Sequence, residues 1–454
     1  MGQIVDHTTL HRAAKYFMDS GKAETHGQAM EMLERFGLTV RVGTEVAHSA
    51  DHQTALLTLV NAARRTLLGG VEVCGLPDAP SLTPLWPGGT LIDAAHALGG
   101  RAVSETRAGW PTAIIGDAEP AEGRTPCWRL TWEGWRGGVV PARHGGPLAE
   151  KASMALAPVL AAAVCAGEAF ANNAGDHPMA GRRAAGLSLW RPGADWRDAD
   201  ATEPVLEYLP SRLWLIGLGN LGQALAWLLA CLPYGDRGDV ELLLQDFDRI
   251  APSNDSTSLL SRTADTGRRK TRVVGEWLEA RGFVTFLEER RFGAWTTRAP
   301  DEPNVALCGV DNALARSALE KPGFDLVVEA GLGAGAQAFR SFSIHSFPAS
   351  GSAEQLWARQ VGQAEENFEN KPAYEALRRG GMDQCGLAQL ASRTVGVPFV
   401  GLTATCLAIS ELLRRLHGGL AFEVAAGSVA ALDGIEKAEV TAAPYPGAYV
   451  RARA

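Results

Sequence analysis

A glycine-rich loop in the second half of the sequence is the first feature whose residue types and spacing suit chemistry. It has the pattern G-x-G-x-x-G, with glycines at Gly217, Gly219 and Gly222 and with Asn220 between them. An apolar run precedes it and a helical pattern follows. Such glycines permit a tight turn and let the backbone approach a phosphate at the positive end of a helix. NAD, FAD and ATP fit this pattern equally well, and a plain tight turn is the alternative.

Polar residues at the ends of the next expected strands extend this candidate site. The strand after the loop ends in carboxylates that can accept hydrogen bonds from ribose hydroxyls. A Ser-Asn pair follows, and then a lysine that opens a helix and can meet a triphosphate as a point charge. A further strand ends in an aspartate that is well placed to hold Mg²⁺. These positions are Asp246, Asp248, Asn254, Lys270, Asp311 and Asn312, with Arg316 shortly beyond.

Each of these residues has an ordinary explanation when it is taken alone. Asp248 suits a turn, Asn254 suits a loop, Lys270 suits a solvated helix and Arg316 suits a surface ion pair. Their joint order and spacing, rather than any single residue, favours a nucleotide site.

The segments GLGNLG, DFDRIAPSN, GRRK and VDNALAR together resemble the adenylation domain shared by MoeB, ThiF and ubiquitin-activating enzymes. That family reads G-x-G-x-x-G, D-x-D-x-x-x-x-S-N, G-x-x-K and D-N-x-x-x-R at similar separations. The resemblance covers roughly residues 211–418. It implies ATP as the nucleotide, ribose binding at Asp246, nucleotide or phosphate contacts at Asn254 and Lys270, and Mg²⁺ binding at Asp311.

A cysteine precedes the last expected helix, in the stretch Met-Asp-Gln-Cys385-Gly. In ubiquitin-activating enzymes a cysteine of this crossover region takes the modifier from AMP as a thioester. The resemblance implies the same role for Cys385, which then needs an accessible thiol with a lowered pKa, helped by Arg393 and Lys371. A small buried residue is the alternative. Five other cysteines are expected in the core: Cys74, Cys165, Cys231, Cys308 and Cys406.

The sequence also departs from the family pattern. Thr257 stands where the family has an arginine that touches the phosphates, and Arg262 or Arg12 is a candidate replacement. The paired C-x-x-C zinc motifs of MoeB and ThiF are absent, which makes a sulfur-carrier activator less favoured.

The elements that must position these residues repeat along the chain. Short amphipathic helices are expected in residues 1–36. Strands are expected at 38–43, 71–75 and 112–117, and again at 213–216, 240–245, 305–308 and 326–329. Helices are expected near 52–68 and 152–171, and again at 223–232 and 399–416. The shared order predicts an α/β fold of two Rossmann-like adenylation-type halves, the first degenerate and the second active. Two unrelated α/β units are the alternative.

The expected organisation is an inactive adenylation-like domain at 1–190, a polar linker at 191–205 and an active adenylation domain at 206–418. The cysteine segment occupies about 350–396 within the active domain, and 419–454 form a short C-terminal extension. The first half is similar to the inactive half of two-part ubiquitin-activating enzymes, which would make the chain its own pseudo-dimer. The compact arrangement is similar to activating enzymes of bacterial ubiquitination-like defence operons.

Composition excludes some classes of function. The net charge is −8 and no long Lys/Arg stripe exists, so nucleic acid is not an expected partner. The seven scattered cysteines favour a reducing cytoplasm over a disulfide framework. The longest apolar run, 152–167, is too short for a membrane span, and the N-terminus lacks a signal-peptide core.

The resemblance implies a two-step activity. The C-terminus of a ubiquitin-like protein is adenylated with Mg·ATP, and Cys385 then forms a thioester that passes the modifier to a conjugating enzyme. The alternatives are adenylation without a thioester, acting on a sulfur carrier, a peptide or tRNA, an NAD-dependent oxidoreductase, and a non-enzymatic scaffold with a vestigial pocket. A homodimer is left open, as is the identity of the modifier.

Overall fold

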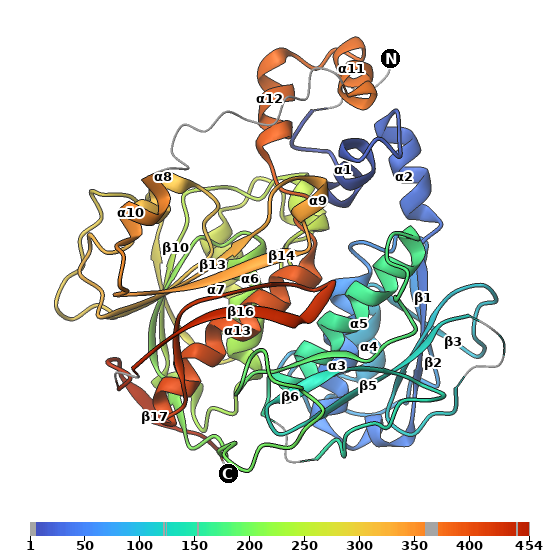
Figure 1. Cartoon of the computed structure of the whole chain (residues 1–454), viewed down its shortest axis with the longest axis horizontal. Helices are drawn as coiled ribbons and strands as arrows, with labels where there is room; N and C mark the ends of the chain where they lie inside the picture. The colour runs from blue at the N-terminus through green and yellow to red at the C-terminus, as the bar shows by residue number, and fades with distance from the viewer. Residues whose placement is uncertain are drawn as a thin grey trace.

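The computed structural model describes residues 6–120, 123, 125–151, 154–358, 371–441 and 444–453. Its two main sheets lie on either side of a layer of helices (Figure 1). The first sheet has the order β3-β2-β1-β4-β5-β6-β7. Its strands are β1 Gly37–Val42, β2 Gly70–Cys74, β3 Gly100–Val103, β4 Thr112–Ile115, β5 Cys127–Glu133, β6 Arg136–Pro141 and β7 Ala185–Ser188.

The second sheet has the order β11-β10-β9-β12-β13-β14-β15-β16. Its strands are β9 Arg212–Ile216, β10 Glu241–Gln245, β11 Val284–Glu288, β12 Val305–Cys308, β13 Leu326–Leu332, β14 Ser341–Phe347, β15 Ala421–Ser428 and β16 Ala431–Val440. A small third sheet pairs β8 Tyr208–Pro210 with β17 Tyr449–Arg451.

The two large sheets share one topology. In each, five neighbouring strands are parallel and the following strands are antiparallel. Strands β3, β2, β1, β4 and β5 correspond in order to β11, β10, β9, β12 and β13. The second sheet adds only β16 at its antiparallel end. This confirms the predicted α/β class with two Rossmann-like halves.

The helices between the sheets belong to both halves. They are α3 Ala50–Ala63, α5 Ala157–Ala174, α6 Asn220–Cys231 and α13 Pro398–Leu416. The Phe170 ring of α5 lies 5.8 Å from the Phe399 ring of α13, centre to centre. The Trp227 indole N–H of α6 donates to the Thr58 hydroxyl of α3 at 3.1 Å. One continuous hydrophobic core thus runs through both halves, and each half completes the burial of the other.

Shorter helices cover one end of this layer. The N-terminal helices α1 Arg12–Asp19 and α2 His26–Glu34 lie beside α11 Pro372–Arg379 and α12 Gln384–Ser392 at the top of Figure 1. The Tyr374 hydroxyl of α11 and the Asp19 carboxylate of α1 are 2.8 Å apart. The remaining helices are α4 Leu91–Ala97, α7 Lys270–Glu279, α8 Ala313–Ser317, α9 Gly335–Ala338 and α10 Ala353–Ala358. The cysteine-bearing segment is therefore packed on the first half's N-terminus.

The expected strands and helices are all present, with bounds that shift by a few residues. Residues 191–205 form a loop that packs on the first half, where the Trp135 indole N–H donates to the Pro204 carbonyl at 2.8 Å. Residues after 419 contribute β15 and β16 to the second sheet. Residues 152–153 of the expected apolar helix and 359–370 of the expected cysteine segment lie outside the described residues. In the part of the chain that the structure describes, no helix has the length and apolarity to cross a membrane.

Candidate active site

Three parallel strand ends bring the predicted nucleotide residues together. Strand β9 lies between β10 and β12, with Ile216 paired to Gln245 on one side and to Cys308 on the other. The glycine loop follows β9, Asp246 follows β10, and Asp311 comes shortly after β12. Because all three strands run the same way, these residues meet at one edge of the sheet, the usual ligand crevice of such folds.

The glycine loop is shaped for close backbone contact. Gly217 has φ +83°, and a Cβ there would lie 2.7 Å from Val310 Cγ1. A Cβ on Gly222 would lie 1.9 Å from the Gly217 carbonyl oxygen, so only glycine fits between the loop and α6. Gly219 faces open space. The loop therefore leaves the N-terminus of α6 accessible to an anion.

Asp246 fixes the loop and faces a lysine. Its Oδ2 accepts the Leu218 N–H at 2.7 Å, and its Oδ1 accepts the Asp248 N–H at 2.8 Å. Lys270, the first residue of α7, places its Nζ 2.8 Å from Asp248 Oδ2 and 3.8 Å from Asp246 Oδ2. The lysine side chain is only 10% exposed. The structure thus gathers the two predicted carboxylates and the predicted lysine in one cluster.

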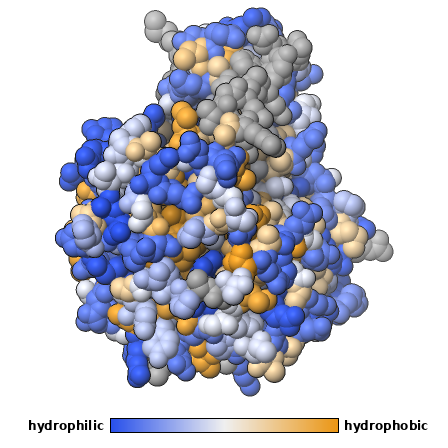
Figure 2. Space-filling view, turned by 60° about the vertical axis from the view of Figure 1, so that its left-hand side comes forward, coloured by the Kyte–Doolittle hydropathy of each residue, from blue (hydrophilic) through white to orange (hydrophobic). Residues whose placement is uncertain are grey.

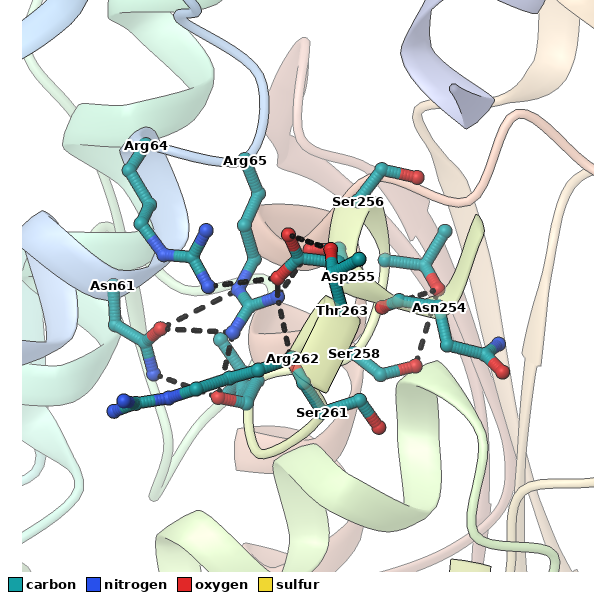
Figure 3. A network of polar contacts seen from close by, with 12 residues as sticks. Asn61, Arg64, Arg65, Asn254, Asp255, Ser256, Ser258, Ser261, Arg262 and Thr263 are labelled. Atoms are coloured by element: carbon teal, nitrogen blue, oxygen red, sulfur yellow. Dashed lines mark hydrogen bonds and ion pairs between the residues drawn. The ribbon is translucent and has the colours of Figure 1, made fainter. Parts of the chain in front are cut away.

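Asn254 and Thr257 lie in the turn after Asp248. The Asn254 Oδ1 accepts the Ala251 N–H at 2.8 Å, and its backbone carbonyl accepts the Ser258 N–H at 2.8 Å. Its side chain points away from Arg65 (Figure 3). Thr257 is buried, and a Cβ on Gly396 would lie 3.2 Å from its Cγ2. The position of the family arginine is therefore taken by a small side chain that packs under the chain leading to α13.

Asp311 lies on an exposed loop whose base is held by a buried ion pair. The Arg316 Nε donates to the Val310 carbonyl at 2.8 Å and lies 3.0 Å from Glu329 Oε1. Glu329 is fully buried, and its Oε2 lies 2.9 Å from His345 Nδ1. Arg316 is thus no surface residue. It ties the loop of Asp311 to β13, and neither Glu329 nor His345 carries a motif that marks it in the sequence.

The side chains of two predicted contact residues bond to neighbouring backbone groups. The Asn220 Nδ2 donates to the Val397 carbonyl at 3.3 Å, beside the first turn of α13. The Asn312 Oδ1 accepts the Ala315 N–H at 3.1 Å and caps α8. Asn220 is the first residue of α6, and Asn312 follows Asp311 on an exposed loop.

Arg12 of the first half lies close enough to this site for its charge to interact with Asp311. Its backbone N–H donates to the Ser256 Oγ at 3.1 Å, and its side chain is buried. Its Nη1 has no hydrogen-bond partner among the described residues. Burial, and next the charge of Arg393, lowers its pKa to about 10, whereas the Asp311 carboxylate acts in the opposite direction. A desolvated guanidinium, still charged at neutral pH, is therefore held near Asp311.

Arg262, the other candidate replacement for the missing arginine, lies elsewhere. Its side chain extends toward Asn61 and away from Asn254 (Figure 3). Its charge acts on Arg65 of the first half. The structure therefore favours Arg12 of the two.

Cys385 is the exposed cysteine of the seven, and none forms a disulfide. It lies in the first turn of α12, where the Asp383 Oδ1 accepts the Gly386 N–H at 2.7 Å. The Gln389 Nε2 lies 3.5 Å from its Sγ. Arg393 is the C-cap residue of the same helix, about 12 Å along its axis from Cys385, and its positive charge acts on Arg12, whose pKa it lowers. Cys308 is buried, and burial raises the pKa of its thiol.

The donor set suits a hard cation that shares its ligands with phosphates. Mg²⁺ is commonly held by one or two carboxylates together with nucleotide phosphates and water. No group of three or more His, Cys, Asp or Glu side chains is arranged for a metal ion in the residues that the structure describes. Asp311 fits the role of a single protein ligand of this kind.

The surface around the site is mixed in polarity. One face of the whole molecule, shown in Figure 2, is mainly hydrophilic with hydrophobic side chains near its middle. Among the exposed apolar side chains, Phe247 lies between the two carboxylates and Leu314 lies just after Asn312, with 39% and 63% of their surface exposed. The Arg291 guanidinium stacks over the Phe247 ring at 4.4 Å. The crevice is thus bordered by both charged and apolar groups.

The fold and the site define a protein of two adenylation-type Rossmann-like halves with one set of nucleotide motifs. Residues 37–189 match the family described as the BilD N-terminal domain, and residues 209–419 match the BilD C-terminal domain. The Bacterial E1-like protein BilD of Collimonas sp. (strain OK412) is 64% identical over 452 residues, which cover 100% of this chain and 98% of that protein. The chain belongs to the BilD family of bacterial E1-like proteins.

Solved structures give weaker likenesses. The crystal structure of E. coli MccB has a TM-score of 0.35 at 12% identity, over 70% of this chain and 93% of that one. E. coli MccB with ATP has a TM-score of 0.33 at 12% identity, over 52% and 65%. The structure of PaaA has a TM-score of 0.33 at 14% identity, over 51% and 64%. The family assignment rests on the sequence matches.

Proposed function

We propose that the chain uses Mg·ATP to adenylate the C-terminus of a ubiquitin-like protein and then takes that protein as a thioester on Cys385. The observation that carries the first step is the cluster at the edge of the second sheet. There the glycine loop, Asp246, Lys270 and Asp311 meet, and the buried Arg12 is added from the first half.

In the first step the modifier's terminal carboxylate attacks the α-phosphorus of ATP, and the bond to pyrophosphate breaks. The glycine loop and the start of α6 hold phosphate oxygens, and Asp246 is placed for the ribose. Lys270 and Arg12 supply positive charge as negative charge develops on the phosphates. Mg²⁺ held by Asp311 would neutralise further phosphate charge.

In the second step the Cys385 thiolate attacks the acyl carbon, a thioester forms and AMP leaves. What supports this residue is its exposure, its place in the first turn of α12 and the burial or partial burial of the other six cysteines. Transfer from Cys385 to a conjugating enzyme would follow. Such an enzyme and a ubiquitin-like protein are the proposed partners, and a cytoplasmic location suits the reduced thiols.

The relative's description as an E1-like protein supports this assignment over an NAD-dependent oxidoreductase. An oxidoreductase would also leave Lys270 and Asp311 without a role. Adenylation without a thioester remains the second candidate, and only the chemistry of Cys385 separates it from the first.

The test is Cys385→Ala in the full chain with its ubiquitin-like protein, ATP and Mg²⁺. ATP–pyrophosphate exchange should persist, because the thiol makes no phosphate or metal contact. The adduct on a non-reducing gel, sensitive to thiol reductant, should disappear. Cys308→Ala, a buried control, should keep both and lose about 1 kcal/mol of stability. If wild type exchanges pyrophosphate but forms no adduct, the adenylation-only candidate is correct.

A further inference from the structure

A second arginine of the first half, Arg65, is buried against the nucleotide-binding half. It follows α3, and its side chain is 1% exposed. Its Nη2 donates to the Leu259 carbonyl at 2.8 Å, and its Nη1 donates to the Ser261 carbonyl at 3.2 Å. The same Nη1 contacts the backbone carbonyl of Asp255 and lies 3.2 Å from Asp255 Oδ1. One guanidinium thus joins three residues of the segment that follows Asn254 (Figure 3).

Neighbouring residues of α3 fix the orientation of this guanidinium. The Asn61 Oδ1 accepts from Arg65 Nε at 3.3 Å and from Arg65 Nη2 at 3.2 Å, and the Asn61 Nδ2 donates to the Leu259 carbonyl at 3.1 Å. The Arg64 Nη2 lies 2.9 Å from Asp255 Oδ1. All three nitrogens of Arg65 are therefore engaged, which holds its planar fork in one position.

The segment that Arg65 holds, residues 255–261, is linked to the glycine loop through the side chain of Gln223. The Gln223 Nε2 donates to the Ser261 Oγ at 2.7 Å and to the Leu218 carbonyl at 3.1 Å. Its Oε1 accepts the Leu260 N–H at 2.8 Å. Gln223 is fully buried. A shift of the segment 255–261 would consequently move Asn254 at one end and disturb the loop around Leu218 at the other.

The backbone of Arg65 also reaches the start of α1. It lies close enough to the buried His11 ring to raise the pKa of that ring, and His11 directly precedes Arg12. Arg12 in turn donates its N–H to Ser256 inside the segment 255–261. Arg65 thus holds a segment that begins beside Asn254 and that also binds the backbone of Arg12.

We propose that Arg65 is a positioning residue of the adenylation site, through which the degenerate half holds the phosphate-binding residues of the other half in register. This inference rests on the proposed adenylation. Arg65 itself does not touch the reacting atoms. Its effect should therefore appear as a change in ATP affinity and not only as a loss of folding stability.

The test compares Arg65→Lys with Arg414→Lys in the full chain. Arg414 is a matched control, since it too is fully buried and donates across the halves, to the Leu189 carbonyl at 2.6 Å. A lysine keeps the charge but lacks the fork, so both variants lose bonds to carbonyls. Asp255→Asn is a second variant, which removes the carboxylate charge that Arg65 and Arg64 share. The measurements are Tm, the Kd of Mg·ATP by calorimetry, and the KM for ATP in pyrophosphate exchange.

We expect Arg65→Lys to raise the Kd and KM for ATP by about tenfold, the size of one lost hydrogen bond to a charged group. Asp255→Asn should raise both in the same direction, and Arg414→Lys should lower Tm while leaving both within about twofold. Equal ATP constants in Arg65→Lys, Asp255→Asn and Arg414→Lys would overturn the positioning role. A wild-type chain that binds ATP but exchanges no pyrophosphate with the modifier would instead overturn the proposed adenylation.

Discussion

The two halves share a strand order but differ at the edge where a nucleotide is expected. In the second half α6 begins directly after Gly219, so the glycine loop and the helix N-terminus act together. In the first half a short turn, Thr44–Ala47, follows Gly43, and α3 begins only at Ala50. The two features that attract a phosphate are therefore separated there.

Carboxylates also occupy this edge in the first half. The Asp117 Oδ1 accepts the Thr44 N–H at 3.0 Å, and the Glu45 Oε2 accepts the Asp117 N–H at 3.1 Å. A hydrogen bond between the side chains of Glu45 and Asp117, followed by the Thr44 N–H, holds the pKa of Asp117 below its usual range. A loop after β4 thus carries an aspartate, like Asp311 after β12, but uses it to close a turn. The same topology supports a ligand site or a hydrogen-bonded turn, depending on a few loop residues.

The number of ATP molecules bound per chain is the strongest test of this difference between the two halves. One ATP per chain is expected, because the first half lacks the glycine loop and ties Glu45 and Asp117 into a hydrogen-bonded turn at this edge. Isothermal calorimetry with Mg·ATP measures the stoichiometry. Two equivalent sites per chain would show that the first half is not degenerate.

Substitution of Asp311 and of its first-half counterpart Asp117 tests the same difference through the rate of pyrophosphate exchange. Asp311→Ala should reduce pyrophosphate exchange by about a thousandfold, since the metal that neutralises phosphate charge loses its protein ligand. Asp117→Ala should leave exchange within about twofold. Circular dichroism checks that both variants fold. Exchange at the wild-type rate in Asp311→Ala would remove this residue from the mechanism.

Arg12 tests whether the first half contributes a charge to the second. Arg12→Ala should lower the exchange rate by about a hundredfold, because a preorganised cation near the phosphates is lost. Arg35→Ala, an exposed arginine at the end of α2, is the control and should have little effect. If both variants behave like wild type, the arginine missing at Thr257 has no replacement in the first half.

The free energy of unfolding should also depend on pH, through the buried His11. Burial is the main cause that lowers the pKa of His11 from its usual 6.5 to about 4. Folding therefore favours the neutral ring, and stability is retained above about pH 6.5 and lost as the pH falls toward 4. The loss should be on the order of 3 kcal/mol in urea unfolding. In His11→Asn the free energy of unfolding should change less with pH than in wild type. An equal change with pH in both proteins would exclude His11 as the cause of the pH dependence.

Local pattern made much of this site predictable. Gly217, Asp246 and Asp311 lie in short motifs at strand ends, and parallel strands bring such ends together without further information. Lys270 opens the helix α7 that follows β10. The repeated order of strands and helices likewise predicted the two halves, since apolar periodicity reports burial directly.

Sequence patterns did not predict the contacts between segments that are far apart in the chain. Arg65 and Asp255 are 190 positions apart, and nothing near either residue marks the pair. Glu329 and His345 lie in apolar strands, where a charged residue shows no periodicity of its own. Asn220 fits its motif, yet its side chain bonds to Val397, a partner that only the packing of α13 provides. Sequence spacing predicts which backbone positions meet and leaves side-chain directions to the packing.

The joining of both sheets in one chain has a consequence for how this protein can evolve. In an assembly of two identical subunits, every substitution appears twice, and each surface must suit both of its positions. Here the strands within residues 37–188 and 212–440 belong to separate stretches of one chain. A change such as the threonine at 257 alters one place and leaves its counterpart untouched. One sheet can therefore lack the ligand loop of the other while both keep the same strand order.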